Sequence, residues 1–240
     1  MALPQTSDQW PQGIPNGETA WLNIGSVSIY RFKLDLNAED QGRALALLSE
    51  EEKARAARFV REYHAARFAA GRAALRTILG SWMQAAPAGI RFEYGEKGKP
   101  VVARGPEFNL SHSHNIALLA VTTQGSVGID IEEVDPRTEI AGIARSFFTA
   151  AETEELLALK THEEQVERFY RLWTCKEAYL KARGTGISAG LNKCELSFDN
   201  DNARIVVPAE PAETKRWQIR MLAAPVGYIA AVCAETTALR

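Results

Sequence analysis

The stretch VGIDIEEV at residues 127–134 decides the fold, because VSIYRFKL at residues 27–34 repeats its apolar pattern 100 positions earlier. In both stretches apolar residues alternate with other residues, which predicts a β-strand with one face in a core. In the later stretch the alternation places Asp130 and Glu132 on one face and the intervening isoleucines on the other. Only one of two related strands therefore carries a pair of carboxylates.

Helix signals repeat at the same offset. ALLSEEE at 46–52 matches SFFTAAE at 146–152, since each has an apolar pair, then a hydroxyl residue, then an acid three positions later. This is the capping-box pattern that opens a helix. Beyond it, we align FAAGRAALR at 68–76 with LWTCKEAYL at 172–180, which needs a further shift of four residues.

Each half also ends in strand-like segments, PEFNLSHSHNIALLAVT at 106–122 and RWQIRMLAAPVGYIAAVCA at 216–234. The order strand, helices, strands thus occurs twice, which predicts an α+β protein whose two similar halves pack as an intramolecular pseudo-dimer. We expect the halves at 21–123 and 124–240, with an N-terminal arm at 1–20. The alternative is a chance match between two amphipathic stretches.

The two halves differ in their charged residues. Aromatic residues of the 27–34 strand stand where Asp130 and Glu132 stand in the second half, and the shifted alignment puts Ala73 opposite Glu177. The matching helix of the first half instead carries the basic residues Arg67, Arg72 and Arg76. We therefore expect one site per chain, with a metal held by the second half and cations for an anionic substrate supplied by the first.

A third carboxylate comes from WTCKEAYLK at 173–181, which reads as a helix with Glu177 and Lys181 on one face. An Asp-x-Glu pair alone is more often a solvated strand face. Together with Glu177, however, Asp130 and Glu132 form a set of oxygen ligands suited to Mg²⁺, which shares its other positions with water and phosphate. Lys181 would then neutralise a substrate phosphate.

Polar donors for such a phosphate are found in FNLSHSHN at 108–115. Ser111 and His112 can present donors at the edge of a cleft, and a phosphate stabilises a charged histidine. A zinc site at His112 and His114 is the alternative, although no cysteine stands at useful spacing. We favour His112 over His114, which we expect to cap the turn or face solvent.

Two further basic segments are candidates for phosphate binding. In GEKGKP at 95–100, Lys97 and Lys99 could reach a phosphate, although an ordinary hairpin turn explains this segment equally well. In the helical region from 53 to 76, two or three of the many arginines could bind phosphate while the others face solvent. Neither standard glycine-rich nucleotide fingerprint is present in the sequence.

Composition narrows the class of protein. The 240 residues are 46% hydrophobic and 24% charged, with a formal net charge of −2 that argues against a dedicated duplex-DNA binder. Three dispersed cysteines indicate free thiols in a reducing cytosol. No signal peptide and no apolar run of transmembrane length is read. We expect a cytoplasmic protein with no nucleic-acid and no membrane partner.

Taken together, the motifs resemble those of the 4′-phosphopantetheinyl transferases, specifically the larger pseudo-dimeric, surfactin-synthetase-activating type. The resemblance rests on NLSHS (109–113), GIDIE (128–132) and WTCKEAYLK (173–181), supported by GKP (98–100) and LSEEEKARAARF (48–59). It covers nearly the whole chain from about residue 21. It implies that the 4′-phosphopantetheine of coenzyme A is transferred to a serine of an apo acyl or peptidyl carrier protein, with Mg²⁺ as cofactor and 3′,5′-ADP as product.

The resemblance also implies roles for individual residues. Mg²⁺ would be held by Asp130, Glu132 and Glu177, and the pyrophosphate would be contacted by His112 and Lys181, with Ser111 and Lys99 nearby. Arg55 and Arg67 fall in the region that grips the 3′-phosphate of coenzyme A. This chain departs from the family where a lysine is expected, because Glu52 stands there with Lys53 beside it; Arg72 is a substitute candidate.

Catalysis would then need no covalent enzyme intermediate. We expect Lys181 and His112 to steady the transition state and Glu177 to deprotonate the carrier serine, directly or through a water. The pseudo-dimeric build suggests a monomer. Two rival classes are a Mg²⁺-dependent nuclease or phosphodiesterase, and a carrier-binding module without activity. Release of nucleotides would identify the first rival, whereas the intact set of acids argues against the second.

Overall fold

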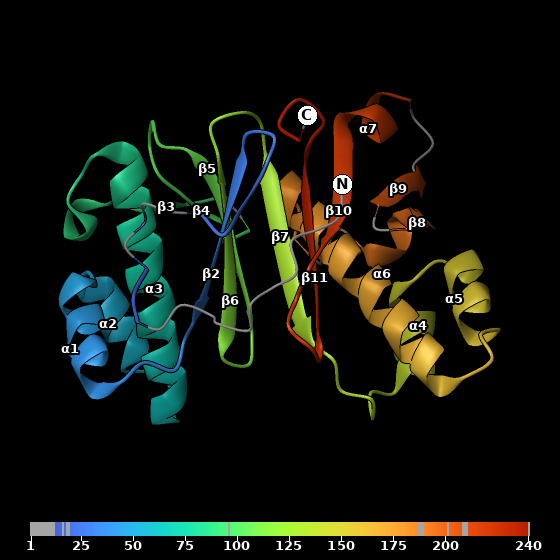
Figure 1. Cartoon of the computed structure of the whole chain (residues 1–240), viewed down its shortest axis with the longest axis horizontal. Helices are drawn as coiled ribbons and strands as arrows, with labels where there is room; N and C mark the ends of the chain where they lie inside the picture. Colours follow the sequence, from blue (N-terminus) through green and yellow to red (C-terminus); the bar gives the residue numbers. More distant parts are fainter. Residues whose placement is uncertain are drawn as a thin grey trace.

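Two antiparallel sheets lie face to face in the computed structural model, and helices cover the outer face of each sheet (Figure 1). The structure describes residues 13–15, 17, 20–95, 97–186, 190–200, 202–207 and 211–239. Most of the predicted arm at 1–20 therefore lies outside the described residues. The layers are helix, sheet, sheet, helix, which is the arrangement expected of two α+β halves packed through their sheets.

The first half is built on a four-stranded sheet in the order β1-β2-β6-β5. Its strands are β1 Leu22–Ile24, β2 Val27–Lys33, β5 Glu107–Ser113 and β6 Ile116–Thr122. Its helices are α1 Ala38–Leu47, α2 Glu50–Ala56 and α3 Glu62–Met83, followed by the 3₁₀ turn η1 Pro87–Gly89 and the small hairpin of β3 Glu93–Tyr94 with β4 Pro100–Val101. The helix α3 packs its apolar face on β2, β5 and β6.

The second half is built on a five-stranded sheet in the order β7-β11-β10-β9-β8. Its strands are β7 Val127–Glu133, β8 Glu195–Asp199, β9 Asn202–Val207, β10 Trp217–Leu222 and β11 Tyr228–Glu235. Its helices are α4 Ile140–Phe147, α5 Ala150–Leu157, α6 His162–Arg183 and α7 Pro211–Arg216, with the 3₁₀ turn η3 Leu191–Lys193. No helix among the described residues is both long and apolar enough to cross a membrane.

A continuous apolar layer lies between the two sheets. Val27 and Ile29 of β2 face this layer from one side, and Ile129 and Ile131 of β7 face it from the other. The prediction that the isoleucines of the 127–134 strand point into a core is therefore confirmed. Since side chains alternate along a strand, Asp130 must face the opposite way, toward α6. The packing of the halves thus fixes which side of β7 carries the acids.

The 100-residue repeat holds throughout the helices. The helices α3 and α6 are both 22 residues long and begin at Glu62 and His162. The four-residue shift in the predicted alignment of these helices is wrong, because the unshifted numbering also matches their buried cations. The first-half counterpart of Glu177 is therefore Thr77, not Ala73.

The buried cations, Arg76 and Lys176, bind to the capping boxes that were predicted from the sequence. One capping box is present at Ser49 and the other at Thr149. Arg76 donates to the capping-box carboxylate Glu52 (2.7 Å) and to the carbonyls of η1, including that of Pro87 (3.1 Å). In the second half Lys176 donates to the capping-box carboxylate Glu152, 100 positions after Glu52, and to the Leu191 carbonyl in η3 (3.0 Å). In each half a buried cation thus ties the capping box of one helix to a 3₁₀ turn, and in the first half Arg72 adds a second buried ion pair to Glu52.

Candidate active site

The helix α6 lies unusually close to β7 because of Gly128. A Cβ built at Gly128 would lie 2.1 Å from the Ala178 carbonyl oxygen and 2.3 Å from the Ala182 nitrogen. Any larger side chain would therefore push α6 away from the strand. This contact brings the adjacent residues of α6, Glu177 and Lys181, over the acidic face of β7. The glycine of GIDIE is thus part of what builds the site.

Asp130 lies at the centre of the site and is 1% exposed. Its Oδ1 accepts hydrogen bonds from the Lys181 ammonium (2.5 Å) and from the Ser111 hydroxyl (2.8 Å). Lys181 also donates to Ser111 (3.1 Å), so side chains from two strands, β5 and β7, and one helix, α6, form a closed triangle of hydrogen bonds. The second carboxylate oxygen, Oδ2, is buried without a hydrogen-bond partner among the described residues. Burial raises the pKa of Asp130, and Lys181 and Ser111 oppose that rise.

The other two acids lie beside Asp130. Glu132 accepts a hydrogen bond from the Ser113 hydroxyl (3.1 Å), and burial together with the Asp130 charge raises its pKa. Burial raises the pKa of Glu177 to about 7; Lys181 opposes the rise, and the charges of Asp130 and Glu132 add to it. The Oε1 atom of Glu177 is buried without a partner among the described residues. Like charges have thus been gathered where water cannot solvate them fully.

These carboxylates suit a divalent cation by their chemistry. Asp130 Oδ2 and Glu177 Oε1 are buried acceptors that no donor of the described chain satisfies, and a cation would serve them. Hard oxygen donors of this kind are what Mg²⁺ prefers. In the part of the chain that the structure describes, no three His, Cys, Asp or Glu side chains already surround one metal position. Which of the three predicted ligands bind the ion stays a prediction.

A cationic groove adjoins the acids on the other face of β5. Because side chains alternate along β5, Ser111 faces β7 whereas His112 faces α3. The groove has a volume of about 670 Å³ and is lined by Leu34, Arg55, Phe59, Tyr63, His64, Arg67, Phe68, His112 and His114. Arg55, Arg67 and His112 were each predicted to contact coenzyme A. The structure brings these three side chains to a single groove.

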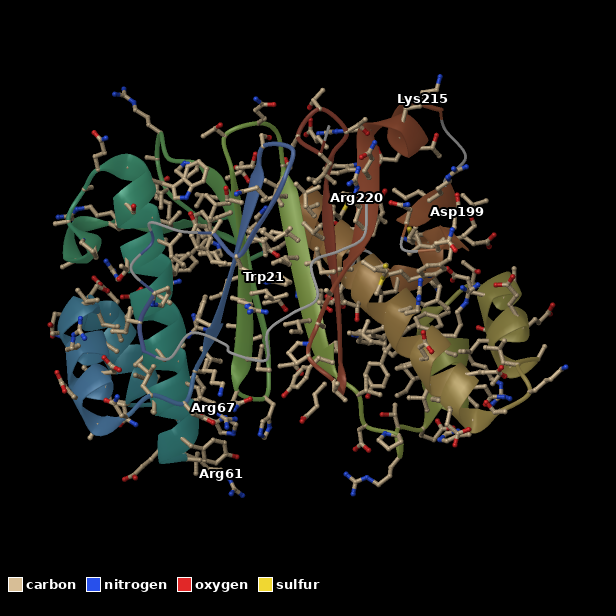
Figure 2. The ribbon with its side chains drawn as sticks, in the orientation of Figure 1. Trp21, Arg61, Arg67, Asp199, Lys215 and Arg220 are labelled. Atoms are coloured by element: carbon tan, nitrogen blue, oxygen red, sulfur yellow. The ribbon has the colours of Figure 1, made fainter. Side chains whose placement is uncertain are left out.

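Arg67 lies near the N-terminal end of α3, the end that follows Arg61 (Figure 2). It is held by two hydrogen bonds to Asp35, at 2.6 and 2.9 Å. Burial lowers the pKa of His112, and the charges of Lys181 and Arg67 lower it further. An anion in the groove would oppose both effects, so the groove is matched to a negatively charged ligand.

The two remaining predicted ligands of coenzyme A, Lys99 and Arg72, do not line the groove. The Lys99 ammonium donates to the carbonyls of Val127 and Lys181, both at 3.3 Å, and so lies across the junction of β7 and α6. Arg72 is buried, donates to Glu52 and stacks on Phe92. The structure therefore places Lys99 at the junction that carries the acids and gives Arg72 an internal partner. A contact between Arg72 and the 3′-phosphate stays a prediction.

A second cavity, of about 1110 Å³, lies between α2 and the η1–β3 segment. It shares Arg55, Phe59 and Phe68 with the cationic groove, and it also contains Arg58 and Arg91. It contains none of the three acids. The site thus consists of an acidic part at β7 and a basic part that continues over α2.

Sequence reasoning missed three residues of this site. His64 lines the groove, and its position three residues before Arg67 on one helix face was a usable signal. Asn109 and Ser113 contact β7, and their two-residue spacing from Ser111 was the corresponding signal on a strand. His114, expected to cap the turn or face solvent, is exposed in the β5–β6 turn and also lines the groove.

Comparison with known proteins agrees with this arrangement. The 4′-phosphopantetheinyl transferase superfamily model matches residues 126–233, and the model of the N-terminal domain of a 4′-phosphopantetheinyl transferase matches residues 37–124. The 4′-phosphopantetheinyl transferase HetI of Nostoc is 37% identical over 91% of this chain and 92% of its own. The 4′-phosphopantetheinyl transferase Sfp of Bacillus subtilis is 32% identical over 87% of this chain and 92% of its own.

The chain therefore belongs to the 4′-phosphopantetheinyl transferase family. Within that family it is an enzyme of the Sfp type, with two similar α+β halves in one chain. Enzymes of this family transfer phosphopantetheine to carrier proteins. The resemblance inferred from the GIDIE and WTCKEAYLK motifs is confirmed.

Proposed function

We propose that this enzyme transfers the 4′-phosphopantetheine moiety of coenzyme A to a serine hydroxyl of an apo acyl or peptidyl carrier protein, with Mg²⁺, and releases 3′,5′-ADP. One observation carries the proposal: two buried acids, a half-buried acid and a lysine lie beside a groove lined by arginines and histidines. Such a pair of sites suits a substrate with a metal-binding pyrophosphate and a separate phosphate, as coenzyme A has.

Asp130, Glu132 and Glu177 are the residues that would hold Mg²⁺. When bound there, the ion would neutralise charge on the pyrophosphate and on the departing 3′,5′-ADP. The two unpartnered carboxylate oxygens of Asp130 and Glu177 support this assignment.

The bond changes of the transfer are simple. The oxygen of the carrier serine forms a bond to the phosphorus that bears the pantetheine group. The bond from this phosphorus to the bridging oxygen breaks, and the electron pair leaves with 3′,5′-ADP. The serine proton passes to Glu177, directly or through a water. A carboxylate has two oxygens, so metal ligation and proton acceptance can use different atoms.

Lys181 and His112 stabilise the charge that develops on the pyrophosphate. Lys181 is 28% exposed while it donates to Asp130, so its ammonium can also reach a ligand in the open part of the site. His112 faces the groove and becomes more readily protonated beside a phosphate. Ser111 orients Asp130, and Lys99 donates to backbone carbonyls at the β7–α6 junction.

The groove would hold the 3′-phosphate of coenzyme A. Arg55 and Arg67 are its guanidinium groups, and His64 adds a third donor from the first turn of α3. Guanidinium groups bind phosphate through paired hydrogen bonds, and Arg67 is already fixed in position by Asp35. Arg72 is less accessible, since it is tied to Glu52, which stands where the family has a lysine.

We also propose that the enzyme consists of two functional halves. Residues 21–123 would supply the phosphate contacts, and residues 124–240 would supply the acids. The protein would act as a cytoplasmic monomer on a carrier protein, without a nucleic-acid or membrane partner.

The test is intact-mass spectrometry of apo carrier proteins incubated with the enzyme and coenzyme A, with Mg²⁺ or with EDTA. We expect a mass gain of one phosphopantetheine that EDTA abolishes, and 3′,5′-ADP in equal amount. Absence of the gain with acyl and peptidyl carriers, despite coenzyme A binding, would instead support a binding module. Release of mononucleotides from DNA or RNA would support the nuclease alternative.

A further inference from the structure

The strands β5 and β7 are both sheet edges and lie side by side where the halves meet. They belong to different sheets, since β5 pairs with β6 and β7 pairs with β11. An edge strand exposes backbone N–H groups that need partners. At this junction side chains of β5, not a backbone ladder, contact the edge of β7.

Three alternate residues of β5 make these contacts. Asn109 accepts a hydrogen bond from the Ile129 N–H through its Oδ1 atom (2.9 Å). Ser111 donates to Asp130, as described above, and Ser113 donates to Glu132 (3.1 Å). Ser111 and Ser113 are two residues apart, as are the carboxylates Asp130 and Glu132 to which they donate. Asn109, Ser111 and Ser113 thus lie on the same face of β5.

Ser113 makes a second contact that fixes its hydroxyl. The Glu133 N–H donates to Ser113 Oγ at 2.9 Å. A hydroxyl has one proton and two lone pairs, so with the N–H on one lone pair the proton is directed to Glu132 Oε2. Ser113 therefore binds both the backbone of β7 and the carboxylate that this backbone carries.

We propose that Ser113 is a positioning residue that orients the Glu132 carboxylate toward the metal, with Asn109 holding β7 in register. The first half then helps to build the acidic site although it carries none of the three acids. This inference rests on the proposed function, because it assigns a metal to those acids. Residues that hold a metal-binding side chain through its second oxygen commonly change metal affinity when mutated.

The inference can be tested by metal binding, without turnover. Mn²⁺ is titrated into the enzyme in the presence of coenzyme A, and free Mn²⁺ is followed by electron paramagnetic resonance. For Ser113→Ala we expect the Mn²⁺ dissociation constant to rise about tenfold. Ser113→Thr keeps the hydroxyl and should stay within about twofold of wild type. The matched control is Ser28→Ala, a strand serine whose hydroxyl donates only to Asn23.

Two further readouts separate positioning from loss of structure. Coenzyme A binding in EDTA and the thermal midpoint should stay near wild type in Ser113→Ala, because Glu133 N–H lies at the exposed end of β7. If Ser113→Ala binds Mn²⁺ as wild type does, or if Ser113→Thr fails like Ser113→Ala, the positioning role is refuted. If the wild-type enzyme itself does not bind Mn²⁺ with coenzyme A, the proposed function falls as well, and the two failures are distinguishable.

Discussion

The two halves of the molecule are alike in their buried ion pairs and unlike at the adjoining strand. In the first half Glu52 closes a capping box and accepts from Arg76, which also binds the η1 carbonyls. In the second half Glu152 and Lys176 do the same with η3. Sequences that differ in almost every residue thus keep one construction, because each buried carboxylate needs a cation and each 3₁₀ turn leaves carbonyls to satisfy.

The equivalent positions of the strands β2 and β7, in contrast, carry different side chains. Tyr30 occupies the position of Asp130, and its hydroxyl accepts from Trp82 (2.8 Å), where Asp130 accepts from Lys181. Ser28 occupies the position of Gly128, and α3 does not approach β2 as closely as α6 approaches β7. The repeat thus supplies a common scaffold, whereas the chemistry depends on a few side chains that only the second half has.

Removing the Asp130 carboxylate should lower the rate of phosphopantetheine transfer more than any other change. Asp130→Ala deletes the buried acid on which Lys181 and Ser111 converge, and metal-assisted charge stabilisation is worth several kcal/mol. We expect phosphopantetheine transfer to fall about 10⁴-fold. The rate of mass gain of an apo carrier measures this. Tyr30→Phe, at the same position of the first half, is the control and should keep a near-wild-type rate. Comparable losses in both variants would mean that the acid acts only through folding.

Glu177→Gln tests the same asymmetry on the helix. The amide keeps the size of the side chain but cannot accept the serine proton, so we expect turnover to fall about 10³-fold. Coenzyme A affinity, measured by calorimetry, should change by less than about threefold because the groove cations remain. Thr77→Ala, the first-half equivalent, should change neither quantity. Near-full turnover of Glu177→Gln would exclude Glu177 as the base.

The sequence predicted those features that depend on period and spacing. Alternation along 127–134 was enough to place Asp130 and Glu132 opposite the isoleucine core, and capping boxes marked where helices begin. A fixed offset then revealed the pseudo-dimer. Each of these signals is local or repeats along the chain, so it can be read without knowing which segments meet.

Contacts between distant segments were not predictable in this way. The four-residue shift failed because Arg72 and Arg76 are both basic, and only the η1 contacts show which one matches Lys176. Asn109 and Ser113 were missed because their value lies in meeting β7 across the junction of the halves. The close approach of α6 to β7, which the missing side chain of Gly128 permits, was not predicted either.

The buried pairs provide a test of what the halves share. Lys176→Met leaves Glu152 buried with only backbone donors, so we expect a loss of unfolding free energy of about 3 kcal/mol. Arg76→Met should cost less, about 1–2 kcal/mol, because Arg72 still donates to Glu52. Urea denaturation measures both. Equal losses would show that Arg72 does not compensate, and the first half would then depend on Arg76 alone.

Gly128→Ala tests the close approach of α6 to β7, which the first half lacks. The added Cβ would meet the Ala178 carbonyl oxygen and the Ala182 nitrogen, so α6 must move away from β7, at about 1–3 kcal/mol. Ser28→Ala, the equivalent change in the first half, should stay within about 0.5 kcal/mol. Transfer activity should fall in Gly128→Ala beyond what the unfolded fraction explains, since Glu177 and Lys181 move with the helix. If activity follows the folded fraction alone, the close approach serves packing and does not set the geometry of the site.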